Sequence, residues 1–406
     1  MQVQLPGTVD STPIYLHGVT VAGKPHDVFF MTTTYGRTIA VDAAAARVLW
    51  TYTPPGYSSW AGSYRITNAA PVADPSRRYV YAAAPDGKIR KLAVANGHQV
   101  WSTAVTRLPE REKLASALTF DRGHVIVPTD GYIGDQPPYQ GHVSVIDAAS
   151  GRVISTWNSL CSNRHGIIAP ALCPASDSAI WARSGVVVEP GTHRLLFATG
   201  NGPYDGHTNW GDSVIELAPN AGVLTRHWTP TDFQQLEDSD ADLGSTGPAL
   251  LPGGWFVQGG KDGKLRLIRP SRMAGTDART GGETQVVPTP GGTDLFGEPF
   301  VWKSLVFLST GAGTDAWRFT GSRLVKAWGN STAGTSPLAA GGLLYVYDPN
   351  GGLNAYVPAT GRLVTRLDAG AGHWQTPVVA DGRIALGEGN ANDHVQSGAL
   401  DLWRLP

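Results

Sequence analysis

The stretch Gly141–Trp157 reads GHVSVIDAASGRVISTW, and it decides the fold because variants of it recur along the chain. Alternating apolar and polar residues lead to an aspartate, a Ser-Gly turn follows, and a short run ends on tryptophan. Alternation on both sides of a glycine-containing turn indicates a β-hairpin. The clearest other copies are GRTIAVDAAAARVLW at Gly36–Trp50, GKIRKLAVANGHQVW at Gly87–Trp101, GDSVIELAPNAGVLTRHW at Gly211–Trp228 and GGLNAYVPATGRLVTRL at Gly351–Leu367. Weaker copies are Gly263–Met273, Thr314–Trp328 and Gly398–Pro406.

Two β-rich runs precede each copy, so one unit contains four strands. The second run is a clear strand, as in Tyr79–Ala84 and Leu343–Tyr347. Eight units in 406 residues average about 51 residues each, which is the size of a propeller blade. We therefore expect residues 1–406 to form one all-β domain, a single eight-bladed β-propeller of four-stranded antiparallel blades.

Ring closure is expected to come from the N-terminus. The final unit, from about Trp374, contains only three strands, whereas Gln2–Leu5 alternates as a strand ahead of the first unit. Pairing Gln2–Leu5 into the last blade would remove an open sheet edge. The tryptophans that end the units are expected to pack between neighbouring blades; they are Trp50, Trp101, Trp157, Trp228 and Trp328.

Composition narrows the possible partners. Charged residues make up only 16% of the chain, and 32 basic against 33 acidic residues give a formal charge of −1. No basic tract occurs, which argues against nucleic acid as a partner. No apolar run approaches the roughly 18 residues that a membrane span needs. Neither nucleic acid nor a membrane-spanning segment is therefore expected.

Two cysteines, Cys161 and Cys173, bear on the compartment. Their spacing fits neither a CxxC site nor a CxxCH haem attachment, so we expect a disulfide that closes one loop, with two unpaired thiols as the alternative. A disulfide would indicate an oxidising compartment. Met1–Gly7 contains neither a basic nor an apolar signal region, so a periplasmic or extracellular protein would be present here without its signal peptide.

A propeller has a central funnel at the face formed by the entrances to its innermost strands and by the turns between second and third strands. The position of each residue within its unit brings basic groups, carboxylates and indoles to this face. The strand entrances supply Lys113, Asp177, Trp181, Arg183, Asp240, Asp242, Glu298, His373 and Trp374, and the turns supply Arg37, Asp86, Asn201, Trp210, Lys261, Asn350 and Asn392.

The repeated A-x-D-x-x-T-G-x-x-x-W pattern resembles the repeat of pyrroloquinoline quinone (PQQ) dehydrogenases and of their non-catalytic relatives. The resemblance covers nearly the whole chain and implies the quinoprotein alcohol dehydrogenase-like propeller. It leaves the function open, because the relatives include outer-membrane assembly scaffolds that bind no cofactor.

Three segments resemble the functional stretches of quinoprotein alcohol dehydrogenases, in the family's order. Ala179–Asn201 resembles the stretch in which a tryptophan forms the floor beneath the quinone and an asparagine ligates Ca²⁺; the matching residues are Trp181 and Asn201. DADLG at 240–244 resembles the segment with the catalytic aspartate, and the match does not choose between Asp240 and Asp242. GGKDG at 259–263 resembles the segment whose basic residue, here Lys261, contacts the quinone.

The chain also departs from the family pattern. The vicinal cysteine pair of many alcohol dehydrogenases is absent, and no haem segment follows. The family's Ca²⁺-ligating glutamate has no clear equivalent, since Asp135 lies in an altered loop. These departures put the metal in doubt.

The resemblance and the chemistry of these residues lead to two main hypotheses: a propeller that binds a small-molecule ligand or substrate, and a scaffold whose partner is a protein or polysaccharide. PQQ is a planar tricarboxylate, so Arg183 and Lys261 could pair with its carboxylates, Trp181 could stack on its ring, and Asn201 and Asp242 could hold Ca²⁺. Asp242 or Asp240 would act as general base toward an alcohol or sugar while the quinone accepts the hydride.

The alternative hypothesis is a non-catalytic scaffold for protein or polysaccharide, in which these residues are polar groups lining a channel. An unrelated lyase or hydrolase in the same funnel is a third interpretation.

Overall fold

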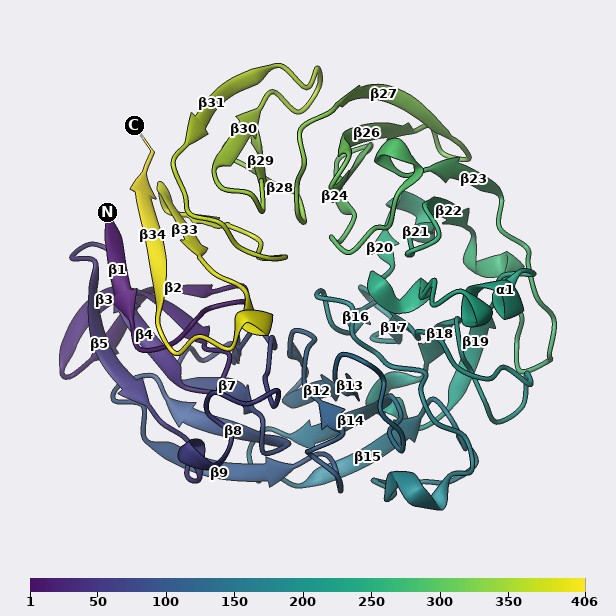
Figure 1. Cartoon of the computed structure of the whole chain (residues 1–406), viewed down its shortest axis with the longest axis horizontal. Helices are drawn as coiled ribbons and strands as arrows, with labels where there is room; N and C mark the ends of the chain where they lie inside the picture. The colour runs from purple at the N-terminus through teal and green to yellow at the C-terminus, as the bar shows by residue number, and fades with distance from the viewer. Residues whose placement is uncertain (406) are drawn as a thin grey trace.

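Residues 1–405, which the computed structural model describes, form a ring of eight four-stranded sheets around a central axis (Figure 1). All strand pairings within the sheets are antiparallel, as the sequence predicts. Blade 1 contains β2 (Ile14–Val21), β3 (Lys24–Thr32), β4 (Thr38–Asp42) and β5 (Arg47–Tyr52). Blade 2 contains β6 (Val72–Ala73), β7 (Tyr79–Ala84), β8 (Lys88–Ala93) and β9 (Gln99–Ala104). Blade 3 contains β11 (Thr119–Asp121), β12 (His124–Pro128), β14 (His142–Asp147) and β15 (Val153–Asn158).

The second half of the ring repeats the same order of strands. Blade 4 contains β16 (Val187–Val188), β17 (Leu195–Ala198), β18 (Val214–Leu217) and β19 (Leu224–Trp228). Blade 5 contains β20 (Ala249–Leu250), β21 (Phe256–Gln258), β22 (Lys264–Ile268) and β23 (Gln285–Pro288). Blade 6 contains β24 (Phe300–Trp302), β25 (Leu305–Thr310), β26 (Gly313–Phe319) and β27 (Leu324–Asn330). Blade 7 contains β28 (Leu338–Ala340), β29 (Leu343–Tyr347), β30 (Leu353–Tyr356) and β31 (Leu363–Leu367).

Blade 8 joins the two ends of the chain. It contains β32 (Val378–Ala380), β33 (Arg383–Gly387), β34 (Gly398–Arg404) and β1 (Gln2–Leu5). The N-terminal strand pairs antiparallel with β34 from Gln2 opposite Asp401 to Leu5 opposite Gly398, and Figure 1 shows the two strands side by side. The prediction that Gln2–Leu5 completes the last blade is therefore confirmed.

Eight hydrophobic clusters in the described part of the chain each join two neighbouring blades, so the core forms a ring as well. Between blades 1 and 2, for example, Phe30 and Val28 pack with Val80 and Leu92. Each sheet is thus covered on both faces by its neighbours, which explains why a single blade is not a stable unit.

Tryptophans at the ends of outer strands reach the next blade, as expected from the repeat. The indole nitrogens of Trp50, Trp101 and Trp328 donate to backbone carbonyls of Val94, Ala148 and Pro358, at 2.9, 3.2 and 2.8 Å. Each indole also lies against the glycine of that blade's turn: a Cβ on Gly97, Gly151 or Gly361 would lie 2.7, 2.8 or 2.5 Å from an indole carbon. These glycines have φ of 72, 76 and 69°, a region that side chains disfavour. The Trp and Gly of the repeat therefore recur as contact partners.

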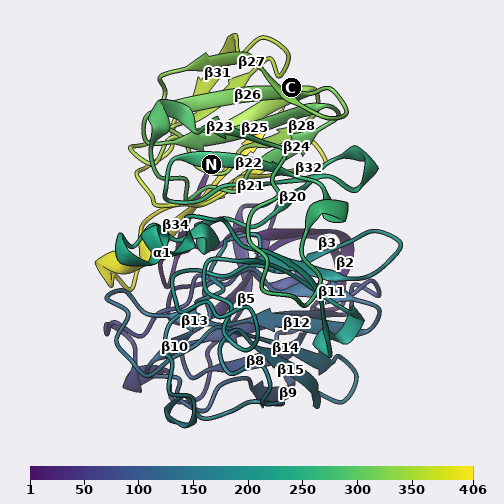
Figure 2. The ribbon, with the colours of Figure 1, turned by 90° about the vertical axis from the view of Figure 1, so that its right-hand side faces the viewer.

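Connections between blades carry the remaining elements. The short sheet of β10 (Glu112–Lys113) and β13 (Asp130–Gly131), the helix α1 (Phe233–Asp238) and the yellow turn η8 (Ala391–Asp393) lie toward the same side of the ring in Figure 2. This side is the funnel face. The other short helical turns are η1 (Tyr57–Ser59), η2 (Pro170–Leu172), η3 (Pro219–Ala221), η4 (Leu243–Ser245), η5 (Pro252–Gly254), η6 (Pro270–Arg272) and η7 (Pro290–Gly292).

Cys161 and Cys173 form a disulfide in the long connection between β15 and β16, which confirms the pairing expected from the sequence. Turn η2 lies inside the loop that the disulfide closes. Among residues 1–405, no helix is both long and apolar enough to cross a membrane.

The closing strand should contribute measurably to stability. Leu5 is buried in the cluster between blades 8 and 1, whereas Gln4 points to solvent. We expect Leu5→Ala to lower the free energy of unfolding by about 2–5 kcal/mol, because it leaves a cavity in that cluster. Gln4→Ala should change it by less than about 0.5 kcal/mol. Urea unfolding followed by tryptophan fluorescence measures both; equal midpoints for the two variants would contradict the closure by β1.

Candidate functional site

The buried carboxylate of Asp10 lies at the centre of the ring and is contacted by residues of blades 2, 4 and 8. Its Oδ2 accepts hydrogen bonds from Asn68 Nδ2 at 2.9 Å and from the backbone nitrogen of Ala391 at 3.0 Å, and lies 2.8 Å from His373 Nδ1. Arg183 donates to Oδ1 at 2.9 Å and also to the Asp10 carbonyl. Burial alone would raise the pKa of Asp10, but Arg183 and His373 together lower it to about 2.

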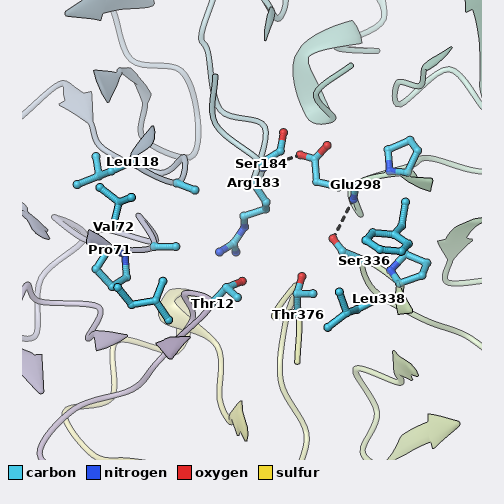
Figure 3. A pocket seen from close by; sticks show the side chains of 16 residues that line it. Thr12, Pro71, Val72, Leu118, Arg183, Ser184, Glu298, Ser336, Leu338 and Thr376 are labelled. Atoms are coloured by element: carbon cyan, nitrogen blue, oxygen red, sulfur yellow. Dashed lines mark hydrogen bonds between the residues drawn. The ribbon is translucent and has the colours of Figure 1, made fainter. Parts of the chain in front are cut away.

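Arg183 is the residue that spans the axis. Figure 3 shows its side chain pointing into a cavity of about 380 Å³, which is lined by the entrances to the innermost strands. Beside Arg183, the Glu298 carboxylate accepts hydrogen bonds from the backbone nitrogens of Ser184 and Gly247, at 2.9 and 2.7 Å. Arg183 and Asp10 therefore close the centre of the channel with a buried ion pair.

Aromatic rings extend from this ion pair toward blades 4 and 5. The His373 ring stacks on Trp374 with centroids 3.9 Å apart, and Phe296 stacks on Trp374 at 4.6 Å. The indole of Trp181 lies 6.1 Å from Trp374 and 6.2 Å from Phe296, tilted by 39° and 45°. Because of this tilt, neither ring stacks face to face on Trp181, which remains half-buried.

Lys261 lies beside Trp181 and links the other residues that the sequence singles out. Its Nζ is 2.5 Å from Asp242 Oδ2, 2.9 Å from Asp240 Oδ1 and 5.5 Å from the centre of the Trp181 ring. Burial would lower the pKa of Lys261, but the two carboxylates raise it above its usual value, so the ammonium stays charged. The other oxygen of Asp242 accepts from the backbone nitrogen of Asn201 at 2.9 Å.

The Asn201 side chain fixes the position of α1. Its Nδ2 donates to the carbonyls of Leu236 and Glu237, at 2.9 and 3.2 Å. Its Oδ1 is buried and has no hydrogen-bond partner in residues 1–405. The same holds for Oδ2 of Asp212, a carboxyl group whose pKa burial raises well above its ordinary value.

Further carboxyl groups face this cluster. Burial and the neighbouring Asp135 raise the pKa of Asp177 to about 6, with smaller contributions from Glu237 and Asp242. Asp135 itself accepts a hydrogen bond from the Tyr139 hydroxyl at 2.7 Å. The side of the funnel between blades 3 and 5 is therefore acidic.

This acidic side does not form a metal-binding shell as it stands. Amide and carboxylate oxygens are the ligands that Ca²⁺ prefers, and the unpartnered Asn201 Oδ1 is one such oxygen. Both oxygens of Asp242, however, are occupied by Lys261 and by the Asn201 backbone. Within the described residues, no three His, Cys, Asp or Glu side chains are grouped so as to hold a metal ion.

Lys113 is a further cation at the funnel, to which the sequence alone assigns no role. It lies on β10 opposite Asp130 of β13, and its ammonium has no hydrogen bond or ion pair within residues 1–405. Burial lowers the pKa of Lys113 and raises that of Asp130 to about 7, although the two groups oppose each other's shift. Lys113 and Asp130 therefore lie on paired strands without a direct hydrogen bond or ion pair between their side chains.

Other residues that the repeat places at this face make local contacts. Asp86 pairs with Arg90 at 2.5 Å, Arg37 lies 4.2 Å from the Tyr57 ring, and buried Trp210 donates to Ser162 at 2.9 Å. Asn350 hydrogen-bonds to Asp348 at 3.0 Å. These residues stabilise their own blades or loops and are not part of the Lys261 cluster.

Comparison with known proteins adds the family. A model of the PQQ-repeat family described as "Outer membrane protein assembly factor BamB" matches residues 7–168 and 303–401. The chain belongs to this family. The unmatched residues between the two segments include Trp181, Asn201, Asp242 and Lys261.

The curated relatives are dehydrogenases. The dehydrogenase subunit of the alcohol dehydrogenase (quinone) of Gluconacetobacter polyoxogenes is 24% identical over 56% of this chain and 34% of its own length. Quinohemoprotein alcohol dehydrogenase ADH IIB of Pseudomonas putida is 23% identical over 55% of this chain and 34% of its own length. The aligned region thus spans about a third of these relatives.

Solved structures agree on the fold. The quinohemoprotein alcohol dehydrogenase of Comamonas testosteroni superimposes with a TM-score of 0.73 at 15% identity, over 100% of this chain and 77% of that one. BamB of Moraxella catarrhalis gives 0.61 at 14% identity, over 100% and 98%. At such identities the likeness establishes the propeller and nothing finer.

Removing the charge of Asp10 should destabilise the whole ring. Asp10→Asn leaves Arg183 without its partner, and breaking a buried pair costs about 3–5 kcal/mol. Because folding depresses the pKa of Asp10 from 3.8 to about 2, the ionised form adds stability above about pH 4 that is lost as the pH falls toward 2. Asp10→Asn lacks this contribution, so the difference in free energy of unfolding between the parent protein and Asp10→Asn should shrink as the pH falls.

Urea unfolding between pH 3 and pH 7 measures the effect. Asp294→Asn is the matched control, since Asp294 is exposed and makes no hydrogen bond or ion pair in the described structure. If the loss of unfolding free energy in Asp10→Asn stays constant with pH, the charge of the carboxylate is not the source of the stabilisation.

Proposed function

We propose that this chain binds a planar, multiply anionic quinone of the pyrroloquinoline quinone type in the funnel beside Trp181, and that the complex oxidises an alcohol or sugar. The observation that carries the proposal is that the Trp181 indole and the buried Asp242 carboxylate both face the Lys261 ammonium. The fold and the dehydrogenase relatives support the same class of function.

Trp181 and two lysines would hold the ligand. The indole face that no other ring stacks on suits a planar aromatic system. Lys261 would contact the ring or a carboxylate, and Lys113, whose ammonium makes no direct ion pair in residues 1–405, would pair with another carboxylate. Arg183 already shares its guanidinium with Asp10, so we assign it to the structure of the axis rather than to the ligand.

Asp242 is the better candidate for the general base. Asp240 and Asp242 both bind Lys261, but their side chains are 75% and 10% exposed respectively. A buried carboxylate in a water-poor site is held in place and can accept the proton of a substrate hydroxyl. A quinone, when bound, supplies the two-electron acceptor. Asp240 would hold Lys261 from the solvent side.

The family match bears on the scaffold alternative, the Asp242–Lys261 pair on a metal, and the disulfide on location. The family model described by a membrane-assembly factor leaves residues 169–302 unmatched, and this segment carries Trp181, Asp242 and Lys261 of the proposed site. Since Asp242 is already paired with Lys261, the proposal includes no metal-dependent step. The disulfide suits an oxidising environment, and we propose a periplasmic or extracellular location.

Titration with PQQ tests binding directly. We expect saturable quenching of tryptophan fluorescence, because the quinone would lie against Trp181. Lys261→Ala and Lys113→Ala should each weaken binding by about tenfold or more, since each removes a charged partner of the ligand. Lys24→Ala is the control, because Lys24 is exposed at the start of β3 in blade 1. Failure to bind at millimolar PQQ, with and without Ca²⁺, would favour the scaffold alternative.

Turnover tests the role of Asp242 separately. With PQQ bound, a panel of primary alcohols and aldoses, and an artificial electron acceptor, Asp242→Asn should retain the parent's PQQ affinity within about threefold and lose its activity. Asp240→Asn should retain most of the activity. Equal activity of the parent protein and Asp242→Asn would exclude Asp242 as the base.

A further inference from the structure

A second cavity opens at the funnel face, on the side of blades 2, 3 and 8. Its volume is about 620 Å³, which is within the usual range for small-molecule sites. Tyr64 precedes blade 2, Arg111 precedes blade 3, Tyr132 lies in the turn between β12 and β14, and Asn392 belongs to η8. None of the residues that line it belongs to the Trp181–Lys261 cluster on blades 4 and 5.

One wall of this cavity is aromatic and held in place by the backbone. The rings of Tyr64 and Tyr132 meet edge to face, with centroids 5.4 Å apart and planes at 83°. The Tyr132 hydroxyl donates to the carbonyl of Pro109 at 3.0 Å, and the Tyr64 hydroxyl to that of Glu110 at 3.3 Å. Tyr64 is nevertheless 51% exposed and the adjoining Ile133 is 74% exposed. The cavity thus presents fixed apolar surface to solvent.

The remaining lining consists of planar hydrogen-bonding groups. Arg111 donates to the side-chain oxygen of Gln136, which orients both groups. The Glu110 carboxylate has no hydrogen bond or ion pair in residues 1–405, and the Asn392 carboxamide makes none through its side chain. Glu110 and Arg111 carry opposite formal charges, so the lining has no excess of acid or base apart from the exposed His394.

This combination selects a class of ligand. An anion would face the unpaired carboxylate of Glu110, and a purely apolar ligand would remove water from Glu110 and Arg111 without replacing their hydrogen bonds. A neutral sugar has an apolar C–H face for an aromatic ring and adjacent hydroxyls that match carboxylate, guanidinium and carboxamide groups. We propose that this cavity is a saccharide-binding site for one or two neutral sugar units.

The site is independent of the quinone proposal but adjoins the same acidic region. Gln136 lines the cavity, while the preceding residue, Asp135, bonds to Tyr139 and raises the pKa of Asp177. The turn that carries these residues is therefore a wall shared by the saccharide site and the acidic side of the funnel. A sugar bound here would be held at the funnel mouth, whether or not the chain oxidises it.

Saturation-transfer NMR and calorimetry with maltose, cellobiose and chitobiose test the proposal on the unmodified chain. We expect at least one of them to bind with a dissociation constant on the order of millimolar or tighter. Tyr64→Ala should weaken binding by about tenfold, since it removes the stacking surface, whereas Tyr64→Phe should stay within about threefold. Gln136→Ala should also weaken it, and Gln235→Ala, on the exposed surface of α1, should not.

No detectable binding of the three disaccharides at about 10 mM would overturn the proposal, and so would binding that Tyr64→Ala leaves unchanged. Glucuronate provides the charge comparison, and tighter binding of this anion than of the neutral sugars would contradict the assigned ligand class. PQQ affinity measured on Tyr64→Ala separates the two sites. An unchanged PQQ affinity with lost sugar binding supports two sites, while loss of both would show that the cavity is part of the quinone pocket.

Discussion

The carboxylate of Asp10 is the constraint on which the geometry of the funnel depends. A propeller leaves its axis lined by short inner strands, and a charge buried there must be fully paired. Asp10 meets this requirement with donors from blades 2, 4 and 8. It also lies 2.8 Å from His373 Nδ1, and His373 stacks on Trp374, which lies against Trp181. The position of the proposed stacking surface is thus linked through packed rings to the central ion pair.

At the perimeter of the ring, contacts between tryptophans and glycines stabilise the packing of neighbouring blades. Each outer tryptophan of blades 1, 2 and 6 fits over a turn glycine of the next blade, so the repeat itself carries the contact between blades. Blade 4 follows the disulfide loop and blade 5 follows α1, and these two blades carry the Lys261 cluster. The regular blades provide a rigid frame, and the irregular connections supply the polar groups.

The repeat predicts the eight blades, the closing strand and the tryptophan contacts, because each depends on local pattern. The sequence also predicts that Trp181, Asn201, Asp242 and Lys261 share one face, and these four residues do lie together. Asp10 was not predicted, since its partner His373 is 363 residues away and no motif marks either residue. Exposure, which sequence does not give, separates Asp240 from Asp242. The unpaired state of Lys113 likewise depends on which side chains the fold brings near it.

Charge is distributed unevenly across the funnel, because Lys261 and Lys113 differ in their ion pairs. Under the proposed function, this difference bears on how a ligand would lie. Lys261 is matched by two carboxylates, so its surroundings carry excess negative charge and suit proton acceptance from a neutral hydroxyl. Lys113 makes no direct ion pair in the described structure, so an anionic group of a ligand could contact its ammonium. A polycarboxylate ring would therefore orient with a carboxylate toward Lys113, which leaves the Asp242 side open to a hydroxylated substrate. Lys261 makes two ion pairs, whereas Lys113 makes none within residues 1–405. This difference would orient a bound ligand relative to its substrate.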